Sequence, residues 1–338
     1  MEHIAQRILG PQELTVSALG IGCMGMSQGY GPRHDDVSVA TLHRAIDRGM
    51  TFVDTATTYG RGHNERLVGR ALIERRDEVV LATKFGIVRD AAGVHVDGTP
   101  ANARACCEES LRRLAVDYVD LFYLHRVDPS VPVEESIGAM AELVAEGKVG
   151  HLGVSEAEPD ALERAAATHP ITALQSEWSL WWRGIEDEIV PTARRLGIAV
   201  VPYSPLGRGF LTGASIDPDR LADDDWRRHD ERFSGDNLTR NRALVDAFAA
   251  VADELGATTA QLALAWLLAQ GDDVVPVVGM TRPERVDQNR PASEIDLTAD
   301  DLARIEDAIP RQAWAGSTSS FGSSTARPLE EASEDASS

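Results

Sequence analysis

Three short apolar runs of the chain each end in an ionisable residue. The runs are Thr51–Asp54, Val79–Lys84 and Asp120–His125. Each has the length and the β-branched or aromatic content of a buried strand. A carboxylate, an ammonium and an imidazole could together support a proton transfer, provided that the fold brings them to one place.

Lys84 is the most informative of these residues. The chain has 33 basic residues, but only two of them are lysines, Lys84 and Lys148. The pKa of an amine can be tuned by its surroundings, whereas a guanidinium stays charged. A lysine at a strand end in an arginine-rich chain therefore suggests a chemical role. The plainer alternative is a structural ion pair with a neighbouring carboxylate.

Tyr59 adds a candidate acid, since it follows Asp54 by five residues in the loop after that strand. A phenol with a pKa near 10 is a weak acid at neutral pH, and a nearby ammonium lowers its pKa. Asp54 would hold the ammonium of Lys84 in place. Tyr59 could then donate a proton to a carbonyl oxygen while hydride reaches the carbon, and His125 would orient the carbonyl or relay the proton.

Alternative interpretations exist for each residue alone. Asp54 could cap a turn, Lys84 could merely pair with it, and His125 could be a satisfied polar group beneath a loop. A metal site would need His125, His151, Asp54 and Glu156 at one mouth. No His-x-His or His-Glu-x-x-His spacing occurs, so the pattern disfavours a metal.

The elements that must position these residues alternate regularly. A hairpin is expected at 6–16, and a first short strand, 19–25, runs into a Gly-rich turn. Further strands are expected at 51–54, 79–84, 118–124, 150–154, 171–175, 198–202 and 274–278, and helices at 36–48, 63–75, 101–115, 134–146, 158–167, 186–196 and 259–269. Eight strands alternating with helices predict a closed (β/α)₈ TIM barrel, with active-site residues at the carboxyl ends of the strands. A doubly wound open sheet is the alternative.

Two segments fall outside this alternation. Residues 207–238 contain Gly-Arg-Gly, Asp-Pro-Asp and an Asp triplet, which predict a long irregular loop over the mouth after the seventh strand. The segment from Gly316 is rich in Ser, Thr and Gly and then acidic. We expect one barrel domain over 1–315 and a mobile acidic tail over 316–338.

Composition narrows the class of protein. The chain has 338 residues, 43% hydrophobic and 26% charged, with a formal charge of −21. An acidic surface disfavours nucleic-acid binding, and no apolar run approaches the roughly 18 residues of a membrane span. The first residues lack the apolar stretch of a signal peptide, and three cysteines make no disulfide framework. We therefore expect a cytoplasmic location and a small-molecule substrate, and leave the oligomeric state open.

Several motifs resemble those of the aldo-keto reductase superfamily, from about residue 6 to about 310. They are Asp54-Thr-Ala-x-x-Tyr59-Gly, Thr83-Lys84-Phe, Leu124-His125-Arg, Gly153-Val-Ser155, Gln175-Ser-Glu and Val201-Pro-Tyr203-Ser-Pro-Leu206-Gly. The start, Gly22-Cys-Met24-Gly-Met26, is similar to the bacterial and plant branch. The resemblance implies an NADPH-dependent carbonyl reductase on a (β/α)₈ barrel. It also implies Tyr59 as the acid, tuned by Lys84 and Asp54, with His125 orienting substrate.

The resemblance further implies a cofactor site. Tyr203 would stack on the nicotinamide, and Ser155 and Gln175 would hold its carboxamide. The segment Gly279–Asn289 is similar to an adenosine clamp in which Arg282 and Arg285 would grip a 2′-phosphate. The remaining implied cofactor residues are Gly22 and Met24 at the first strand, Ser204, Leu206, Gly207 and Arg208 at the pyrophosphate, and Gly279, Gln288 and Asn289 in the clamp.

The chain also departs from the family pattern. Glu156 stands where many relatives carry Asn beside the nicotinamide amide, and an ionised carboxylate cannot donate a hydrogen bond. Thr281 stands where many relatives have a basic residue, which weakens the preference for NADP over NAD. Trp178, Trp181 and Trp182 could line the pocket or belong to the core.

Two functions fit these motifs. The leading hypothesis is an NADPH-dependent reductase of aldehydes and ketones. The alternative is a nucleotide-binding regulatory or redox-sensing subunit on the same barrel, similar to the potassium-channel β subunits, with little turnover. Rapid NADPH consumption with a simple aldehyde would distinguish the two.

Overall fold

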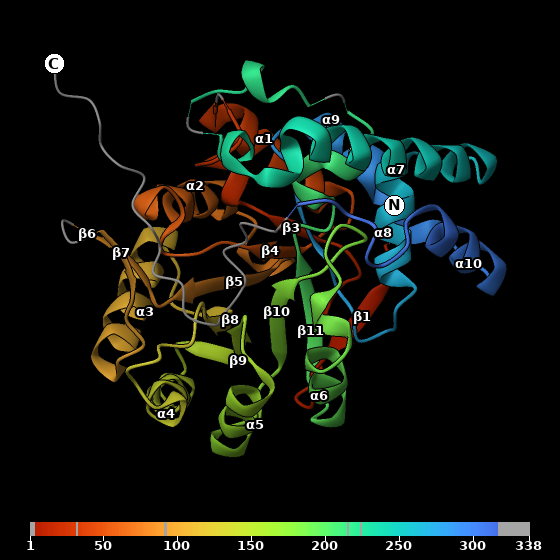
Figure 1. Ribbon diagram of the computed structural model, residues 1–338. Coiled ribbons are helices and arrows are strands. Elements are labelled where there is room, and N and C mark those ends of the chain that lie inside the picture. The colour runs from red at the N-terminus through yellow and green to blue at the C-terminus, as the bar shows by residue number, and fades with distance from the viewer. Residues whose placement is uncertain (1–3, 32, 91–92, 215, 224, 317–338) are drawn as a thin grey trace, which may run out of the picture.

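The structure is a computed structural model that describes residues 4–31, 33–90, 93–214, 216–223 and 225–316 (Figure 1). Its centre is a sheet of eight parallel strands in the order β11-β10-β9-β8-β5-β4-β3-β12. The strands are β3 (Gly20–Gly22), β4 (Phe52–Asp54), β5 (Val80–Phe85), β8 (Val119–Leu124), β9 (Val149–Ser155), β10 (Ala173–Glu177), β11 (Ala199–Tyr203) and β12 (Val277–Gly279). The predicted (β/α)₈ barrel is confirmed, and the open doubly wound sheet is excluded.

The barrel closes between β11 and the segment that leads into β12. Val200 N donates to Asp273 O at 2.8 Å, and Val275 N donates to Val200 O at 2.9 Å. Pro276 has no N–H to continue this ladder, and its carbonyl instead accepts from Gly20 N of β3 at 2.9 Å. The predicted strand 274–278 is therefore divided between its two neighbours, and only Val277–Gly279 forms the regular strand β12.

Helices surround the barrel, as Figure 1 shows. Those that alternate with strands are α1 (Asp35–Asp47), α2 (His63–Leu72), α3 (Pro100–Leu114), α4 (Val133–Ala145), α5 (Pro159–Thr168), α6 (Ile189–Arg195) and α8 (Thr259–Leu268), with α7 (Gly235–Glu254), α9 (Pro283–Asn289) and α10 (Ala299–Ala308) as additions. Local signals set several ends. Thr99 caps α3 by accepting from Asn102 N, and Thr258 and Gln261 form a capping box at α8, each satisfying N–H groups that a helix start leaves unpaired.

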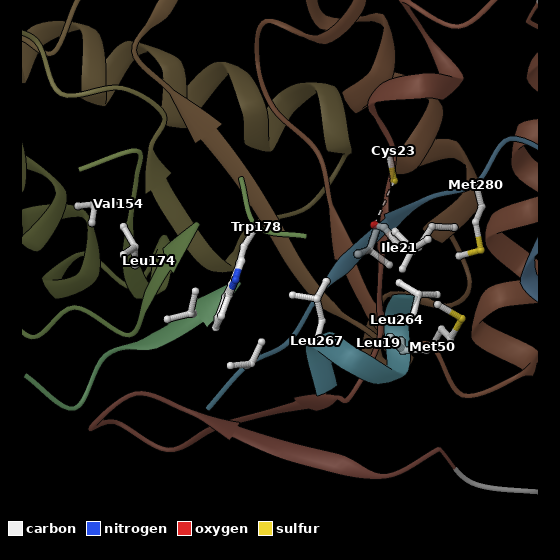
Figure 2. Close-up of a cluster of buried hydrophobic side chains, with 14 of the residues drawn as sticks. Leu19, Ile21, Cys23, Met50, Val154, Leu174, Trp178, Leu264, Leu267 and Met280 are labelled. Atoms are coloured by element: carbon white, nitrogen blue, oxygen red, sulfur yellow. Dashed lines mark hydrogen bonds between the residues drawn. The ribbon is translucent and has the colours of Figure 1, made fainter. Parts of the chain in front are cut away.

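Strand alternation divides the core in two. A small cluster fills the barrel interior and includes Phe52, Ala82, Leu121 and Tyr123. A larger cluster lies between the strands and the helices; Figure 2 shows part of it, including Ile21 of β3 and Leu264 and Leu267 of α8. Along each strand, successive side chains enter one cluster or the other, as the two-residue repeat requires.

Two antiparallel hairpins accompany the barrel. The predicted first hairpin pairs β1 (Gln6–Leu9) with β2 (Leu14–Ser17), and its Leu9 and Val16 join the interior cluster. A second hairpin, β6 (Ile87–Asp90) with β7 (Gly93–Val96), follows β5 and was not predicted.

The long segment after β11 carries short 3₁₀ turns, the first over Gly207–Thr212, and α7 already begins at Gly235 rather than near 238.

The predicted tail lies outside the described residues from position 317 onward. Within the described part of the chain, no helix is both long and apolar enough to cross a membrane.

Candidate active site

The side-chain alternation explains how the ionisable residues meet. Phe52 points into the barrel, so Asp54, two residues on, points inward at the carboxyl end of β4. The same step leads from Ala82 to Lys84 on β5 and from Tyr123 to His125 after β8. All three side chains are buried. A side chain two residues beyond an interior apolar residue thus reaches the mouth of the barrel.

Lys84 is the centre of the group. Its Nζ lies 2.5 Å from Asp54 Oδ1, 2.8 Å from the carbonyl oxygen of Thr55 and 3.4 Å from Tyr59 Oη. Asp54 Oδ2 also accepts a hydrogen bond from Gln175 Nε2 at 3.0 Å. The ammonium therefore has three oxygen neighbours, and its carboxylate partner is itself held from the opposite side of the barrel.

Tyr59 and His125 form the surface above this pair. Their ring centroids lie 5.9 Å apart with an interplanar angle of 83°, which is an edge-to-face arrangement. Lys84 Nζ lies 5.1 Å from the centroid of the Tyr59 ring. His125 Nδ1 is buried and has no hydrogen-bond partner among the described residues. The phenol and the imidazole thus face one reaction space over a buried cation.

Burial controls the protonation of the group. It raises the pKa of Tyr59, and the charge of Lys84 acts in the opposite direction without outweighing it. The ammonium of Lys84 therefore lowers the pKa of Tyr59 as expected, but burial has the larger effect, so the pKa is raised overall. Burial, followed by the charges of Arg126, Lys84 and Arg89, holds the pKa of His125 well below its usual value. At neutral pH the site thus presents a protonated phenol and a neutral imidazole.

Burial alone would lower the pKa of Lys84, but Asp54 and Tyr59 outweigh it, and the net direction is upward. The ammonium therefore stays charged. A buried cation beside a protonated phenol stabilises the phenolate that forms when the proton leaves, which is the electrostatic requirement for a tyrosine acid.

A cavity of about 470 Å³ opens above these residues. Asp54, Tyr59 and His125 line it, while Lys84 lies beneath its surface. Most residues of the expected cofactor site line it as well: Gly22, Met24, Ser155, Gln175, Tyr203, Ser204, Leu206, Arg208, Gly279, Arg282, Arg285 and Asn289. One continuous hollow therefore joins the reaction space to the segment that resembles the adenosine clamp.

Two of the expected cofactor residues do not line the cavity. Gly207 has a φ of +54°, and a Cβ on it would lie 2.9 Å from Trp181 Cβ, so this position faces the core. Gln288 is exposed, and its side chain accepts from Arg285 Nη1 at 2.9 Å. Gly207 thus lies at a positive-φ turn against Trp181, and Gln288 contacts the cavity residue Arg285 rather than the cavity itself.

The metal alternative requires His151 at the mouth. His151 instead lies near the amino end of β9, where its Nδ1 is 3.5 Å from Thr172 Oγ1. Thr172 Oγ1 also donates to Gln12 of the first hairpin. No group of three His, Cys, Asp or Glu side chains with metal-binding geometry occurs among the described residues.

The tryptophans belong to the packing beneath the mouth. Trp178 and Trp181 are buried, and none of Trp178, Trp181 and Trp182 lines the main cavity. Trp178 contacts Trp266 edge to face, and Trp181 packs on Phe210 and Trp314. The core interpretation is the one that the structure supports.

Several cavity residues were missed. Arg126 donates to the His125 carbonyl oxygen at 2.6 Å and to Ser155 Oγ at 3.2 Å; it stands in the Leu-His-Arg motif but had been given no role. Arg89 and Ile87 enter from the unpredicted hairpin. Arg227 of the long loop lies over the Tyr30 ring at 5.3 Å, so this loop reaches across the mouth to the segment after β3.

Glu156 is buried beside the expected nicotinamide position. Its Oε1 accepts from Glu177 N at 2.8 Å. Burial raises its pKa to about 7, against the opposing effects of Arg126 and the Glu177 amide. A carboxyl group with this pKa is partly protonated at neutral pH, so Glu156 can donate a hydrogen bond in part of the population, as Asn would.

Comparisons with known proteins agree with this geometry. The model of the aldo/keto reductase family matches residues 18–310. A protein named probable aldo-keto reductase 1 of Glycine max is 47% identical over 305 residues, covering 89% of this chain and 88% of that protein. The chain therefore belongs to the aldo/keto reductase family.

Solved structures agree as well. A glycerol dehydrogenase from Gluconobacter oxydans superposes with a TM-score of 0.84 at 31% identity, covering 93% of this chain and 98% of that one. An aldo-keto reductase from Klebsiella pneumoniae, solved in complex with NADPH, has a TM-score of 0.71 at 30% identity, covering 91% and 96% of the two chains. Both are relatives that share the fold.

Proposed function

We propose that this protein reduces aldehydes and ketones to alcohols with NADPH, using Tyr59 as the general acid. The observation that carries the proposal is the buried contact of Lys84 with Asp54 and Tyr59 at the floor of a cavity long enough to continue to Arg282 and Arg285. The solved relative with NADPH supports the choice of cofactor.

The chain offers a suitable cradle for the cofactor. Ser204 and Arg208 have φ values of +52° and +57°, and non-glycine residues in this region are strained and concentrate at ligand sites. Arg282 and Arg285 are exposed, and no carboxylate among the described residues forms an ion pair with either of them. Guanidinium groups without an ion-pair partner suit a phosphate.

Bound NADPH supplies the hydride; the residues of the chain supply the proton and the orientation. Neutral His125 donates a hydrogen bond that holds the substrate carbonyl, and Tyr59 Oη transfers its proton to the carbonyl oxygen. Lys84, fixed by Asp54, stabilises the resulting phenolate. Because the reaction space is buried, these electrostatic interactions are stronger than they would be in water.

Purified protein should be mixed with NADPH and 4-nitrobenzaldehyde, and both NADPH absorbance and the alcohol product should be measured. Steady turnover at 1 s⁻¹ or faster, within the usual range for enzymes of roughly 1–1,000 s⁻¹, supports the reductase. Tight NADPH binding with almost no turnover on a panel of aldehydes, dicarbonyls and sugars would instead favour the regulatory subunit.

A further inference from the structure

Arg89 is a cation of the cavity that has no role in the chemistry above. Arg89 lies on β6 and lines the cavity together with Ile87, Thr58 and Tyr59. Its Nε donates to Thr58 Oγ1 at 3.1 Å. This threonine directly precedes the proposed acid, so the guanidinium lies close to the reaction space.

The charge of Arg89 is not balanced. Across the described chain, no carboxylate forms an ion pair with Arg89, and its side chain donates to the neutral hydroxyl of Thr58. Burial lowers its pKa, and the charged group that adds to this lowering is another cation, Arg61. Arg61 itself is exposed and forms no ion pair with a described carboxylate. In a protein with a formal charge of −21, Arg89 thus lies at the cavity near a second guanidinium group, and neither group has a carboxylate counter-ion among the described residues.

The position of Arg89 separates it from the proposed cofactor site. The hairpin follows β5, whereas Ser204 and Arg208 follow β11. In the closed strand order, β5 and β11 stand on opposite sides of the barrel. Arg282 and Arg285 follow β12, on the far side of β3 and β4 from β5. Arg89 therefore lies at the end of the cavity where a substrate, rather than the nucleotide, would extend.

We propose that Arg89 binds an anionic oxygen group of the substrate, so that the preferred substrates are aldehydes or ketones carrying a carboxylate or a phosphate. This inference rests on the proposed reductase function. Arg presents a planar fork of donors that matches either group. The contact is remote from the reacting carbonyl, so it should act mainly on KM, because it is made equally in the ground state and the transition state.

Matched substrates test the charge directly. The reductions of 4-carboxybenzaldehyde and its uncharged methyl ester, methyl 4-formylbenzoate, should be compared, followed by glyceraldehyde 3-phosphate and glyceraldehyde to separate carboxylate from phosphate. We expect kcat/KM to be about tenfold or more higher for at least one charged member than for its neutral partner. Equal values within both pairs would overturn the inference while leaving the reductase function intact.

Variants then assign the preference to Arg89. Arg89→Gln should collapse the charged-to-neutral ratio through a higher KM for the charged member, and Arg89→Lys should keep part of it. Arg112→Gln also removes one positive charge. Arg112 lies near the carboxyl end of α3, on the side of the barrel where the strands begin and away from the cavity mouth, so this variant should leave the ratio unchanged. If Arg89→Gln and Arg112→Gln preserve the ratio equally, Arg89 is not the anion site.

A binding measurement makes the outcome independent of turnover. The products 4-(hydroxymethyl)benzoate and methyl 4-(hydroxymethyl)benzoate should be titrated into the protein with NADP⁺ by calorimetry. Tighter binding of the acid by wild type, lost in Arg89→Gln, supports the inference even if neither aldehyde is reduced, a result that would contradict only the reductase function. Equal binding of both alcohols would contradict the anion site. An unchanged NADP⁺ affinity and circular-dichroism spectrum show that the variant is folded.

Discussion

Lys84 and Asp54 form an ion pair of 2.5 Å in which the two side chains are 0% and 4% exposed. Removing two charges from water costs several kcal/mol per ion, so such a pair adds little to stability by itself. Its position beneath Tyr59 gives it a different purpose. The pair holds a charged ammonium at a depth where its field on the phenol is only weakly screened by water.

The shape of the Lys84 site leads to a first prediction. Lys84→Arg should lower kcat nearly as much as Lys84→Met, because the planar guanidinium cannot replace a point charge that reaches Asp54, Thr55 O and Tyr59 together. Steady-state reduction of 4-nitrobenzaldehyde measures the effect. An arginine variant with near-normal kcat would mean that Lys84 only balances charge.

The ion pair also predicts a stability effect. Asp54→Leu leaves the buried Lys84 ammonium and a Gln175 amide donor unsatisfied, and should lower the free energy of unfolding by roughly 3–5 kcal/mol. Adding Lys84→Met removes the orphaned charge and should recover much of that loss while the protein stays inactive. Urea unfolding of the two single variants and the double variant gives the comparison. Additive losses in the double variant would contradict the coupling.

Arg282 and Arg285 should set the cofactor preference. Replacing both by Gln should weaken NADPH binding by roughly tenfold or more for each arginine, since a hydrogen bond to a charged group contributes about 1.5–3 kcal/mol. NADH lacks the extra phosphate and should lose much less. Titration by protein fluorescence tests this, with Arg282→Gln and Arg285→Gln also made singly and Arg112→Gln as the control that removes one positive charge elsewhere. Equal losses for the two cofactors would show that these arginines do not read the 2′-phosphate.

Glu156 predicts a pH effect with a definite sign. Its pKa in the folded protein, about 7, lies above the usual value, so the folded state favours the protonated carboxyl. The resulting stability is fully present below about pH 4 and is lost as the pH rises through 7. Glu156→Gln keeps an oxygen that can accept from Glu177 N and cannot ionise. Its free energy of unfolding relative to wild type should therefore be higher at pH 8 than at pH 5, by on the order of 3 kcal/mol at most, and its Tm relative to wild type should rise in the same direction.

Thermal unfolding of both proteins at the two pH values is the measurement. A difference in Tm that is the same at pH 5 and pH 8 would mean that Glu156 ionises normally in the folded protein.

Much of the barrel and its floor could be predicted from the sequence because the signals are local. An apolar run such as Val80–Phe85 predicts a buried strand. The two-residue alternation then places Lys84 on the same face as Ala82, without knowledge of the rest of the chain. Parallel strands then bring their carboxyl ends to one edge. The positions of Asp54, Lys84 and His125 could be predicted in this way.

Other features depend on contacts that no local pattern records. The backbone hydrogen bonds pass from β11 to β3 at Pro276, and this change depends on which strand lies on each side of the segment. Gly207 lies against Trp181, which is distant from it in the sequence, so a Cβ at this position would lie 2.9 Å from Trp181 Cβ. Arg89 lies on a hairpin too short to show a clear alternation pattern, and only the folded chain shows that no described carboxylate forms an ion pair with it. The direction in which the pKa of Tyr59 is shifted likewise depends on its burial, which the spacing of the motif does not reveal.

The central claim is that Tyr59 is the proton donor, and Tyr59→Phe tests it most directly. The change removes one hydroxyl and leaves the ring against His125. We predict that kcat for 4-nitrobenzaldehyde falls by at least about 100-fold, while the Kd for NADPH, measured by fluorescence on the same preparation, stays within about twofold because no part of the proposed cofactor site changes. Wild-type turnover by Tyr59→Phe would contradict the account.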